Sequence, residues 1–397
     1  MLLFFAFLIS ITLLGSVTIG SLSIRVYATI AMMLYILYHR FDKKQEYIPV
    51  SHNLLKTYIL FIVFMGFAQL LNGELLEYQF FKKLLAYHLV AIVAFLSIER
   101  HVNTYLDLKR TIVLLTAIML FNNITTILQY VGNDVGWSIG MLFGDIHDNA
   151  DFSSTHESLL GYSRTPGIFG NVVNNAFAIA VFGPLPLCLL NGRSNLFTKA
   201  CVFSSFITAL VACFMTQQRA AFYLFLACFA VYLFVAIRRN ALLIVVIGIC
   251  VLFVSDLDFG DFDAGRLASA ADDARSGLYK HAFAFIADHP ILGGPISFQR
   301  ITGLSSHNVA LDSWIFAGFL GFVTMMVLCF NTMRRGLDIF VRGLIVEGQN
   351  RYMIFCATAV INAMVYGFTH NTSYLTGNVI IFIVLALMLK TSNIDTK

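Results

Sequence analysis

The sequence predicts an all-α, polytopic integral membrane protein with about 12 transmembrane helices. Its 397 residues are 58% hydrophobic and only 12% charged, with a mean hydropathy of +0.79, whereas soluble domains carry roughly 25% charged residues. The apolar residues also fall in blocks of about 16–24, the length that a helix needs to cross roughly 30 Å of hydrocarbon. The sequence lacks the short alternating segments that mark a transmembrane barrel.

The predicted spans follow one another along the whole chain, so residues 1–397 are expected to form a single membrane domain. The spans are expected at 2–20, 22–38, 57–72, 84–98, 111–131, 167–190, 200–216, 220–237, 241–255, 308–331, 352–369 and 374–390. Two connections are long and polar, at residues 132–166 and 256–306. The N-terminal segment lacks a basic region and a clear cleavage site, which predicts a retained first span.

The distribution of charge predicts which side each connection faces. Lysine and arginine concentrate in alternate connections, including residues 39–56, 99–110 and 334–351, and in the C-terminal tail. Because cytoplasmic loops are enriched in these residues, both termini are predicted to be cytoplasmic. The two long segments then face the exoplasmic side, which is the periplasm if the chain lies in the inner membrane of a Gram-negative bacterium.

The second long segment contains a predicted amphipathic helix at about Asp273–Asp288, which Pro290 ends. Its apolar stripe consists of Leu278, Ala282, Phe285 and Ile286. Arg275 and Tyr279 lie beside this stripe. Such a helix is expected to lie flat on the membrane or over the helical bundle.

Several classes of site are not indicated. The seven cysteines all lie in apolar segments, which argues against a disulfide framework or a zinc site. The acidic run Asp256–Asp263 lacks the ligand spacing of a calcium loop, and His156-Glu157 lacks the second histidine of a zinc-protease motif. No long basic run suggests nucleic acid. We therefore expect neither a metal nor a cofactor nor a nucleic-acid partner.

Three arginines at the predicted exoplasmic edge are candidate phosphate ligands. Arg219 lies in Thr216-Gln-Gln-Arg219 between two apolar segments, where a charged side chain is costly unless it snorkels or pairs with an anion. Arg164 precedes Thr-Pro-Gly-Ile-Phe-Gly-Asn at the start of a span, and a helix N-terminus favours anions. Arg275 on the amphipathic helix is a similar candidate. The alternative role is snorkelling for Arg219, an ordinary loop position for Arg164 and contact with lipid headgroups for Arg275. The functional interpretation of all three is bidentate binding of phosphate.

His307 begins a predicted span as His307-Asn308 and is followed by Asp312 and by Gly318-Phe-Leu-Gly321. Histidine exchanges protons near neutral pH, so this side chain could deprotonate a hydroxyl presented from the aqueous side. A structural role at the helix start is the alternative. Asp312 either orients the histidine or simply lies at the interface.

In their order and spacing these motifs resemble the family of O-antigen polymerases and O-antigen ligases, over about residues 160–390. The resemblance rests on Arg164 with its Gly-Ile-Phe-Gly-Asn sequence, Thr216-Gln-Gln-Arg219-Ala-Ala, Arg275 followed by Asp288-His-Pro-Ile-Leu-Gly293, and His307-Asn308 with nine residues before Gly318.

The resemblance implies a metal-independent, inverting glycosyl transfer in the outer leaflet, with an oligosaccharide on undecaprenyl pyrophosphate as the donor. Arg164, Arg219 and Arg275 would neutralise the departing pyrophosphate. His307 would be the catalytic base or would position the acceptor hydroxyl. Asn308 and Tyr279 are assigned to substrate binding. The expected partners are the lipid-linked oligosaccharide and the bilayer. A chain-length regulator is a further candidate partner.

Three functions are compared on this basis. A polymerase joins O-antigen, capsule or exopolysaccharide repeat units, whereas a ligase transfers the glycan to the lipid A core. The His-Asn-x9-Gly spacing is ligase-like, but residues 129–137 and 368–377 resemble polymerases, and polymerase is preferred. A transporter or flippase is the rival from another class. Transporters bind substrate near the bilayer midplane, and here the charged residues collect at the outer edge.

Overall fold

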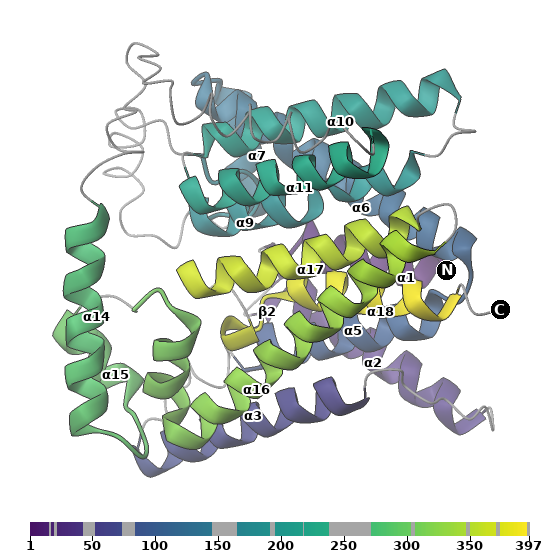
Figure 1. Ribbon diagram of the computed structural model, residues 1–397. Coiled ribbons are helices and arrows are strands. Elements are labelled where there is room, and N and C mark those ends of the chain that lie inside the picture. Colours follow the sequence, from purple (N-terminus) through teal and green to yellow (C-terminus); the bar gives the residue numbers. More distant parts are fainter. Residues whose placement is uncertain are drawn as a thin grey trace.

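The computed structural model describes residues 1–15, 17–19, 22–42, 52–73, 84–144, 165–190, 195–216, 218–237, 271–302, 306–346, 350–370 and 374–394. Within these ranges the chain forms a bundle of long helices, with α14 (Ala271–Asp288) and α15 (Pro295–Thr302) lying at one end of it (Figure 1). The strands in the described part are β1 (Thr18–Ile19) and β2 (Leu22–Ser23), a short antiparallel pair. The all-α class is confirmed.

The other elements are α1 (Leu2–Thr12), α2 (Ile24–Asp42), α3 (His52–Leu71), η1 (Leu84–Leu89), α5 (Val90–His101), α6 (Tyr105–Tyr130), α7 (Asp134–Gly144), α9 (Val172–Phe182), η3 (Leu185–Leu189), α10 (Leu196–Met215), α11 (Arg219–Ile237), α16 (Val309–Ile345), α17 (Arg351–Thr369), η4 (Tyr374–Thr376) and α18 (Val379–Ile394). Among the described residues, 6 helical segments are long and apolar enough to cross a membrane. They lie at Asn53–Leu71, Tyr105–Tyr130, Val172–Leu189, Leu196–Met215, Val309–Ile345 and Arg351–Thr369. These segments support an all-α membrane protein.

Some helices differ from the predicted spans. The segment expected to span 2–20 is helical only to Thr12, because the β1–β2 pair follows. The long polar segment after α6 begins with the apolar helix α7, which the prediction missed because its 11 residues are too few to cross a bilayer. The predicted span 241–255 lies outside the described residues, as do the polar stretches 145–164 and 256–270.

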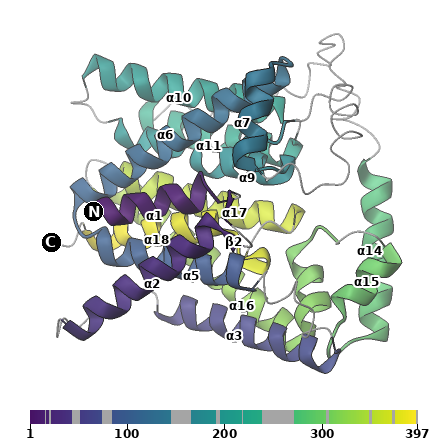
Figure 2. The same ribbon diagram turned by 180° about the vertical axis from the view of Figure 1, so that it is seen from behind.

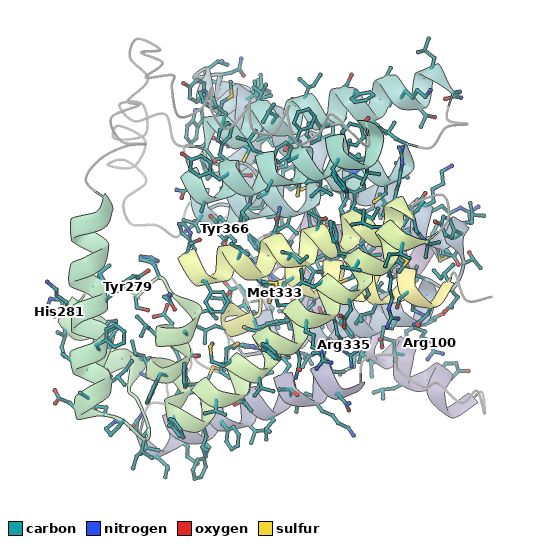
Figure 3. The ribbon with its side chains drawn as sticks, viewed as in Figure 1. Arg100, Tyr279, His281, Met333, Arg335 and Tyr366 are labelled. Carbon is teal, nitrogen blue, oxygen red and sulfur yellow. The ribbon has the colours of Figure 1, made fainter. Side chains whose placement is uncertain are left out.

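The two ends of the bundle differ in the helices and the basic residues that lie there. α1 begins and α18 ends at the end opposite to α14 and α15 (Figures 1 and 2). Arg100 lies at that same end, which we call the basic end, and Arg335 lies between the middle of the bundle and this end (Figure 3). We call the other the α14 end. Basic residues gather on the cytoplasmic side of membrane proteins, so the assignment of the basic end to the cytoplasm stays a prediction from charge.

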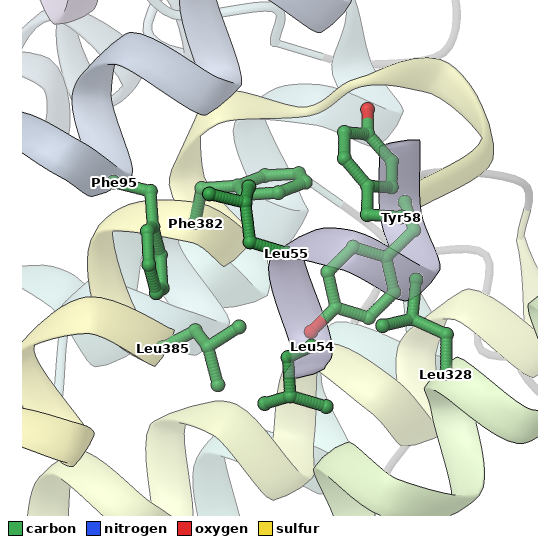
Figure 4. Close-up of a pocket in the computed structure, with 8 residues that line it drawn as sticks. Leu54, Leu55, Tyr58, Phe95, Leu328, Phe382 and Leu385 are labelled. Atoms are coloured by element: carbon green, nitrogen blue, oxygen red, sulfur yellow. The ribbon is translucent and has the colours of Figure 1, made fainter. Parts of the chain in front are cut away.

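The interior of the bundle is apolar and closely packed. α16 packs along α3 and α17, and α18 packs against α5 and α17. A hollow between α3, α5, α16 and α18 is lined by Leu54, Tyr58, Phe95, Leu328 and Leu385, among others (Figure 4). It has room for about one water molecule, so a polyprenyl chain does not fit there.

A separate hydrophobic cluster places α14 over the bundle. The α14 residues Ala282, Phe285 and Ile286 are buried, and they pack with Phe298 of α15 and Ile315 of α16. They belong to the apolar stripe expected from the sequence. In the structure the stripe faces other helices of the chain.

Candidate functional site

His307 lies on a sharp turn directly before α16. Its φ of 57° is the one positive value for a non-glycine residue in the part of the chain that the structure describes. Such a conformation costs roughly 1–2 kcal/mol for an L-residue, so the neighbouring contacts must hold it. Asn308 provides one of them by capping α16: its Oδ1 accepts from the N–H groups of Ala310 and Leu311 at 2.9 and 3.3 Å.

Asp312 holds the same turn from within α16. Its Oδ1 accepts from the backbone N–H of Ser306 at 2.8 Å and from the Ser306 hydroxyl at 2.7 Å. The N–H groups of His307 and Asn308 face the same carboxylate. The residue is fully buried, and its Oδ2 has no hydrogen-bond partner among the described residues. Because a buried carboxylate is costly, its place here is best explained by the turn that it orients.

Asn308 also joins the start of α16 to the end of α17. Its Nδ2 donates to the carbonyl of Phe368 at 3.0 Å, so both ends of the side chain are engaged. His370, which follows α17, is buried and stacks on Tyr366 with ring centroids 4.6 Å apart. The Tyr366 hydroxyl donates to the carbonyl of Val173 in α9 at 3.2 Å. The start of α16, the end of α17 and the start of α9 therefore meet at the α14 end (Figure 3).

Residues 165–168 form a second turn at this end, and buried side-chain amides hold it. Asn122 and Gln129 of α6 and Asn175 of α9 each make a hydrogen bond to the backbone of this turn. The sequence analysis missed Asn122 and did not assign a role to the other two. A lone amide within an apolar span gives no local signal of what it binds.

The described backbone brings the start of the turn at residues 165–168 to the end of α10. Thr165 directly follows Arg164, and its hydroxyl donates to the carbonyl of Met215 at 3.4 Å. Met215 ends α10, and Arg219 is the first residue of α11 shortly afterwards. Arg164 and the side chain of Arg219 lie outside the described part of the structure. The N-terminus of α11 adds a partial positive charge that favours an anion at this place.

The predicted binding residues of α14 lie on another wall of the same end. Arg275 and Tyr279 are one helical turn apart, so they share a face of α14. Tyr279 is half-buried and lies on the side of the helix toward the bundle, whereas His281 lies on the opposite side and is exposed (Figure 3). Arg275 is placed by its backbone alone.

The turn after α14 pairs with a break in α16. Gly318, with φ 65°, interrupts the helix. Beside the break, the N–H of Phe319 donates to the carbonyl of Ile291 at 3.0 Å, and the N–H of Gly294 donates to the carbonyl of Ile315 at 2.8 Å. A Cβ on Gly318 would lie 2.1 Å from the oxygen of Ile291. Two glycine-containing motifs of the sequence thus form one contact, which ties α14 to α16.

The comparison with known proteins bears on this end of the bundle. A family model described as O-antigen ligase matches residues 204–326. The matched segment contains Arg219, Arg275, His307 and the break at Gly318. Arg164 lies before it. No curated protein and no solved structure matches the chain. Residues 204–326 are therefore similar to the O-antigen ligase family, which agrees with the resemblance to O-antigen polymerases and O-antigen ligases found in the sequence.

Proposed function

We propose that the chain transfers a glycan from undecaprenyl pyrophosphate to a sugar acceptor at the α14 end, in the outer leaflet of the bacterial inner membrane. We further propose that it polymerises O-antigen, capsule or exopolysaccharide repeat units. The main support is that the His307 turn and the turn that directly follows Arg164 in the sequence lie at one end of the bundle, within or next to the segment that matches the O-antigen ligase model. Basic residues at the opposite end favour a periplasmic location for this one.

The proposed reaction exchanges one bond at the anomeric carbon of the donor sugar. The acceptor hydroxyl oxygen attacks this carbon, its bond to the phosphate oxygen breaks, and undecaprenyl pyrophosphate leaves with the bonding electrons. The configuration inverts because attack and departure are on opposite faces. His307 takes the proton of the hydroxyl as general base. Asp312 and Asn308 keep the histidine in place through the contacts described above.

The arginines supply the positive charge in this scheme, without a metal ion. Arg164, Arg219 and Arg275 offset the charge that grows on the pyrophosphate, an effect that is strong where water is scarce. Their planar guanidinium groups suit two hydrogen bonds to one phosphate. Tyr279, on the bundle side of α14, is proposed to contact the glycan. Asn308 is assigned to positioning, because its side chain already makes three hydrogen bonds to the backbone.

A ligase is the second candidate function, and the description of the matching family model favours it. The chemistry would be the same, with a sugar of the lipid A core as the acceptor. A gel of the lipopolysaccharide from a deletion strain separates the two. A polymerase deletion leaves one repeat unit on the core and no ladder, whereas a ligase deletion leaves bare core with polymer on the lipid carrier. Repeat units retained on the cytoplasmic leaflet would instead indicate a flippase.

The variant Arg219→Ala tests the site itself. Loss of a charge that stabilises the leaving group should reduce transfer by roughly a hundredfold or more, while the protein still inserts in the membrane. The assay is the ladder in a complemented deletion strain, with an immunoblot of the membrane fraction. Arg100→Ala removes an arginine from the basic end and is the matched control, with a normal ladder expected. A normal ladder in Arg219→Ala would remove this residue from the site.

A further inference from the structure

Gly318 divides α16 into two parts, and the contacts around this break determine how the parts lie relative to each other. Its φ of 65° and ψ of −168° are far from helical values. The first part, residues 309–317, begins shortly after His307 and contains Asp312, which holds the His307 turn. The second part is residues 319–345. Because regular helix geometry does not continue through Gly318, contacts across the break must set the direction of the first part.

Trp314 contacts both parts of α16 and the turn that follows α14. It lies in the first part, and its ring centroid is 5.5 Å from that of Phe319 and 4.7 Å from that of Phe322, both in the second part. Its Nε1 donates to the carbonyl of Pro290 in the turn at 2.8 Å. Rotation of the first part about the break would separate these groups. One side chain thus links the two parts of α16 to each other and to the turn.

The main chain of the same turn contacts both sides of the break. The hydrogen bonds described above join it to the carbonyl of Ile315 before the break and to the N–H of Phe319 after it. A Cβ on Gly293 would lie 2.3 Å from the oxygen of Ile315 and 2.6 Å from that of Trp314, so the turn and the first part of α16 are in direct main-chain contact. Because the turn directly follows α14, these contacts also fix the first part relative to α14 and its Tyr279.

The end of α3 contacts the break as well. Gln69 is 4% exposed, and its Nε2 donates at 3.5 Å to the carbonyl of Phe316, in the last turn of the first part. Asn72, which directly follows α3, donates through its Nδ2 to the carbonyl of Leu292 at 3.4 Å. Both distances are long for hydrogen bonds, so each bond is weak. A buried amide such as that of Gln69 nevertheless requires a partner, and the main chain at the break provides it.

We propose that Trp314 and Gln69 are positioning residues of the glycosyl transfer, which fix the direction of the first part of α16 and thereby the place of His307 relative to α14. This inference rests on the proposed function, since it acts through the role of His307 as general base. A base must lie within about 2.6–3.2 Å of the hydroxyl that it deprotonates, so a small rotation at the break is enough to reduce turnover. α3 then supports the site although it precedes the segment that matches the family model.

The test uses Trp314→Phe and Gln69→Met, which keep much of the apolar bulk and remove the bonds to Pro290 and Phe316. The full-length protein is reconstituted in lipid with the undecaprenyl-pyrophosphate-linked oligosaccharide from the deletion strain as donor. Rates are measured well below the unfolding temperature of each variant. We expect kcat to fall roughly tenfold in Trp314→Phe and roughly threefold in Gln69→Met. The KM for the donor should change little, because binding of its pyrophosphate is assigned to residues outside α16.

A background without the histidine separates positioning from stability. In His307→Ala, the addition of Trp314→Phe should cause no further loss of kcat, because the position of a missing base does not affect the reaction. The loss of thermal stability that Trp314→Phe causes should remain in this background. Turnover and stability thus respond differently to the same substitution.

Asn362→Leu is the matched control for the loss of a buried amide. Asn362 donates to the carbonyls of Ala180 and Leu224 at 3.4 and 3.1 Å, within the packing of α9, α11 and α17. These bonds are similar in length to that of Gln69, but they join elements other than α14 and α16. The control variant should have a lower melting temperature, with kcat and KM of the folded protein unchanged.

Two outcomes overturn different claims. If His307→Ala impairs transfer but Trp314→Phe and Gln69→Met lower only the melting temperature, as Asn362→Leu does, both side chains are structural and the positioning inference is wrong. A further loss of kcat when Trp314→Phe is added to His307→Ala contradicts the inference as well. If His307→Ala itself has normal kcat, the proposed role of His307 in the reaction fails first.

Discussion

Two turns at the α14 end, residues 165–168 and 290–294, are held in different ways. Side-chain amides from α6 and α9 hold the first. Main-chain groups at the break in α16 hold the second, together with side-chain bonds such as that of Trp314. A Cβ on Gly318 would meet a main-chain oxygen, whereas a Cβ on Gly167 would meet amide side chains that can rotate. Steric contact therefore fixes the second turn more tightly than the first.

Gly318→Ala should cause the largest loss of folding stability, on the order of 3 kcal/mol. The added Cβ would meet the backbone oxygen of Ile291 at 2.1 Å, and φ at this residue is 65°. Thermal unfolding of the purified protein in detergent measures the loss. Gly66→Ala in α3 is the control, since nothing lies within 4 Å of its Cβ. Equal melting temperatures for the two variants would show that the break in α16 is not sterically fixed.

Gly167→Ala should cost less stability, about 2 kcal/mol. Its Cβ would lie 2.4 and 2.7 Å from the amide oxygens of Asn122 and Asn175, which can rotate away at the expense of their hydrogen bonds. The same unfolding assay ranks it against Gly318→Ala. A larger loss here than at Gly318 would mean that the amides are as rigid as the main chain, and the contrast between the turns would disappear.

Trp314→Phe should cost about 1 kcal/mol of stability. It removes the hydrogen bond from Nε1 to the carbonyl of Pro290, 2.8 Å long, while a phenyl ring can keep the stacking on Phe322. Comparison with Tyr366→Phe, which removes the bond from the Tyr366 hydroxyl to the carbonyl of Val173, tests a second side-chain hydrogen bond at this end. No change in either melting temperature would show that single side-chain bonds contribute little there.

His307→Gly should have the smallest effect on folding and a large one on turnover. Glycine adopts φ near 57° without strain, so stability should be unchanged or raised by about 1 kcal/mol. Loss of a general base should lower kcat roughly a hundredfold, with the donor KM little changed. His307→Ala should lose as much turnover and be less stable than the glycine variant. Normal kcat in both variants would leave the histidine with a structural role only.

Much of the fold could be predicted from local features of the sequence. The length and hydropathy of the apolar segments located most of the helices, because each segment contains both properties. The apolar stripe of α14 was visible for the same reason, and Ala282, Phe285 and Ile286 are buried. The helix α7 was missed, because it is apolar but shorter than a span. The contact between Gly318 and Ile291 could not be predicted either, because helical periodicity does not say which segments meet.

The candidate site was predictable only where a charged or catalytic residue type marks it. His307 stood out by its chemistry at the start of a span, and the structure adds the backbone conformation and the buried Asp312 that support it. Asn122 gave no such signal. A single amide on an apolar helix looks the same whether it binds another helix or the peptide groups of a turn. Only the three-dimensional arrangement distinguishes these cases.

The break in α16 has a consequence for how this helix can cross a bilayer. The element has 37 residues, but Gly318 divides it. The part after the break, residues 319–345, is about 40 Å long at 1.5 Å per residue, against roughly 30 Å of hydrocarbon. That part alone is therefore long enough to cross a membrane. The part before the break, with the His307 turn and Asp312, can then take another direction, so the proposed site need not lie on the axis of the spanning helix.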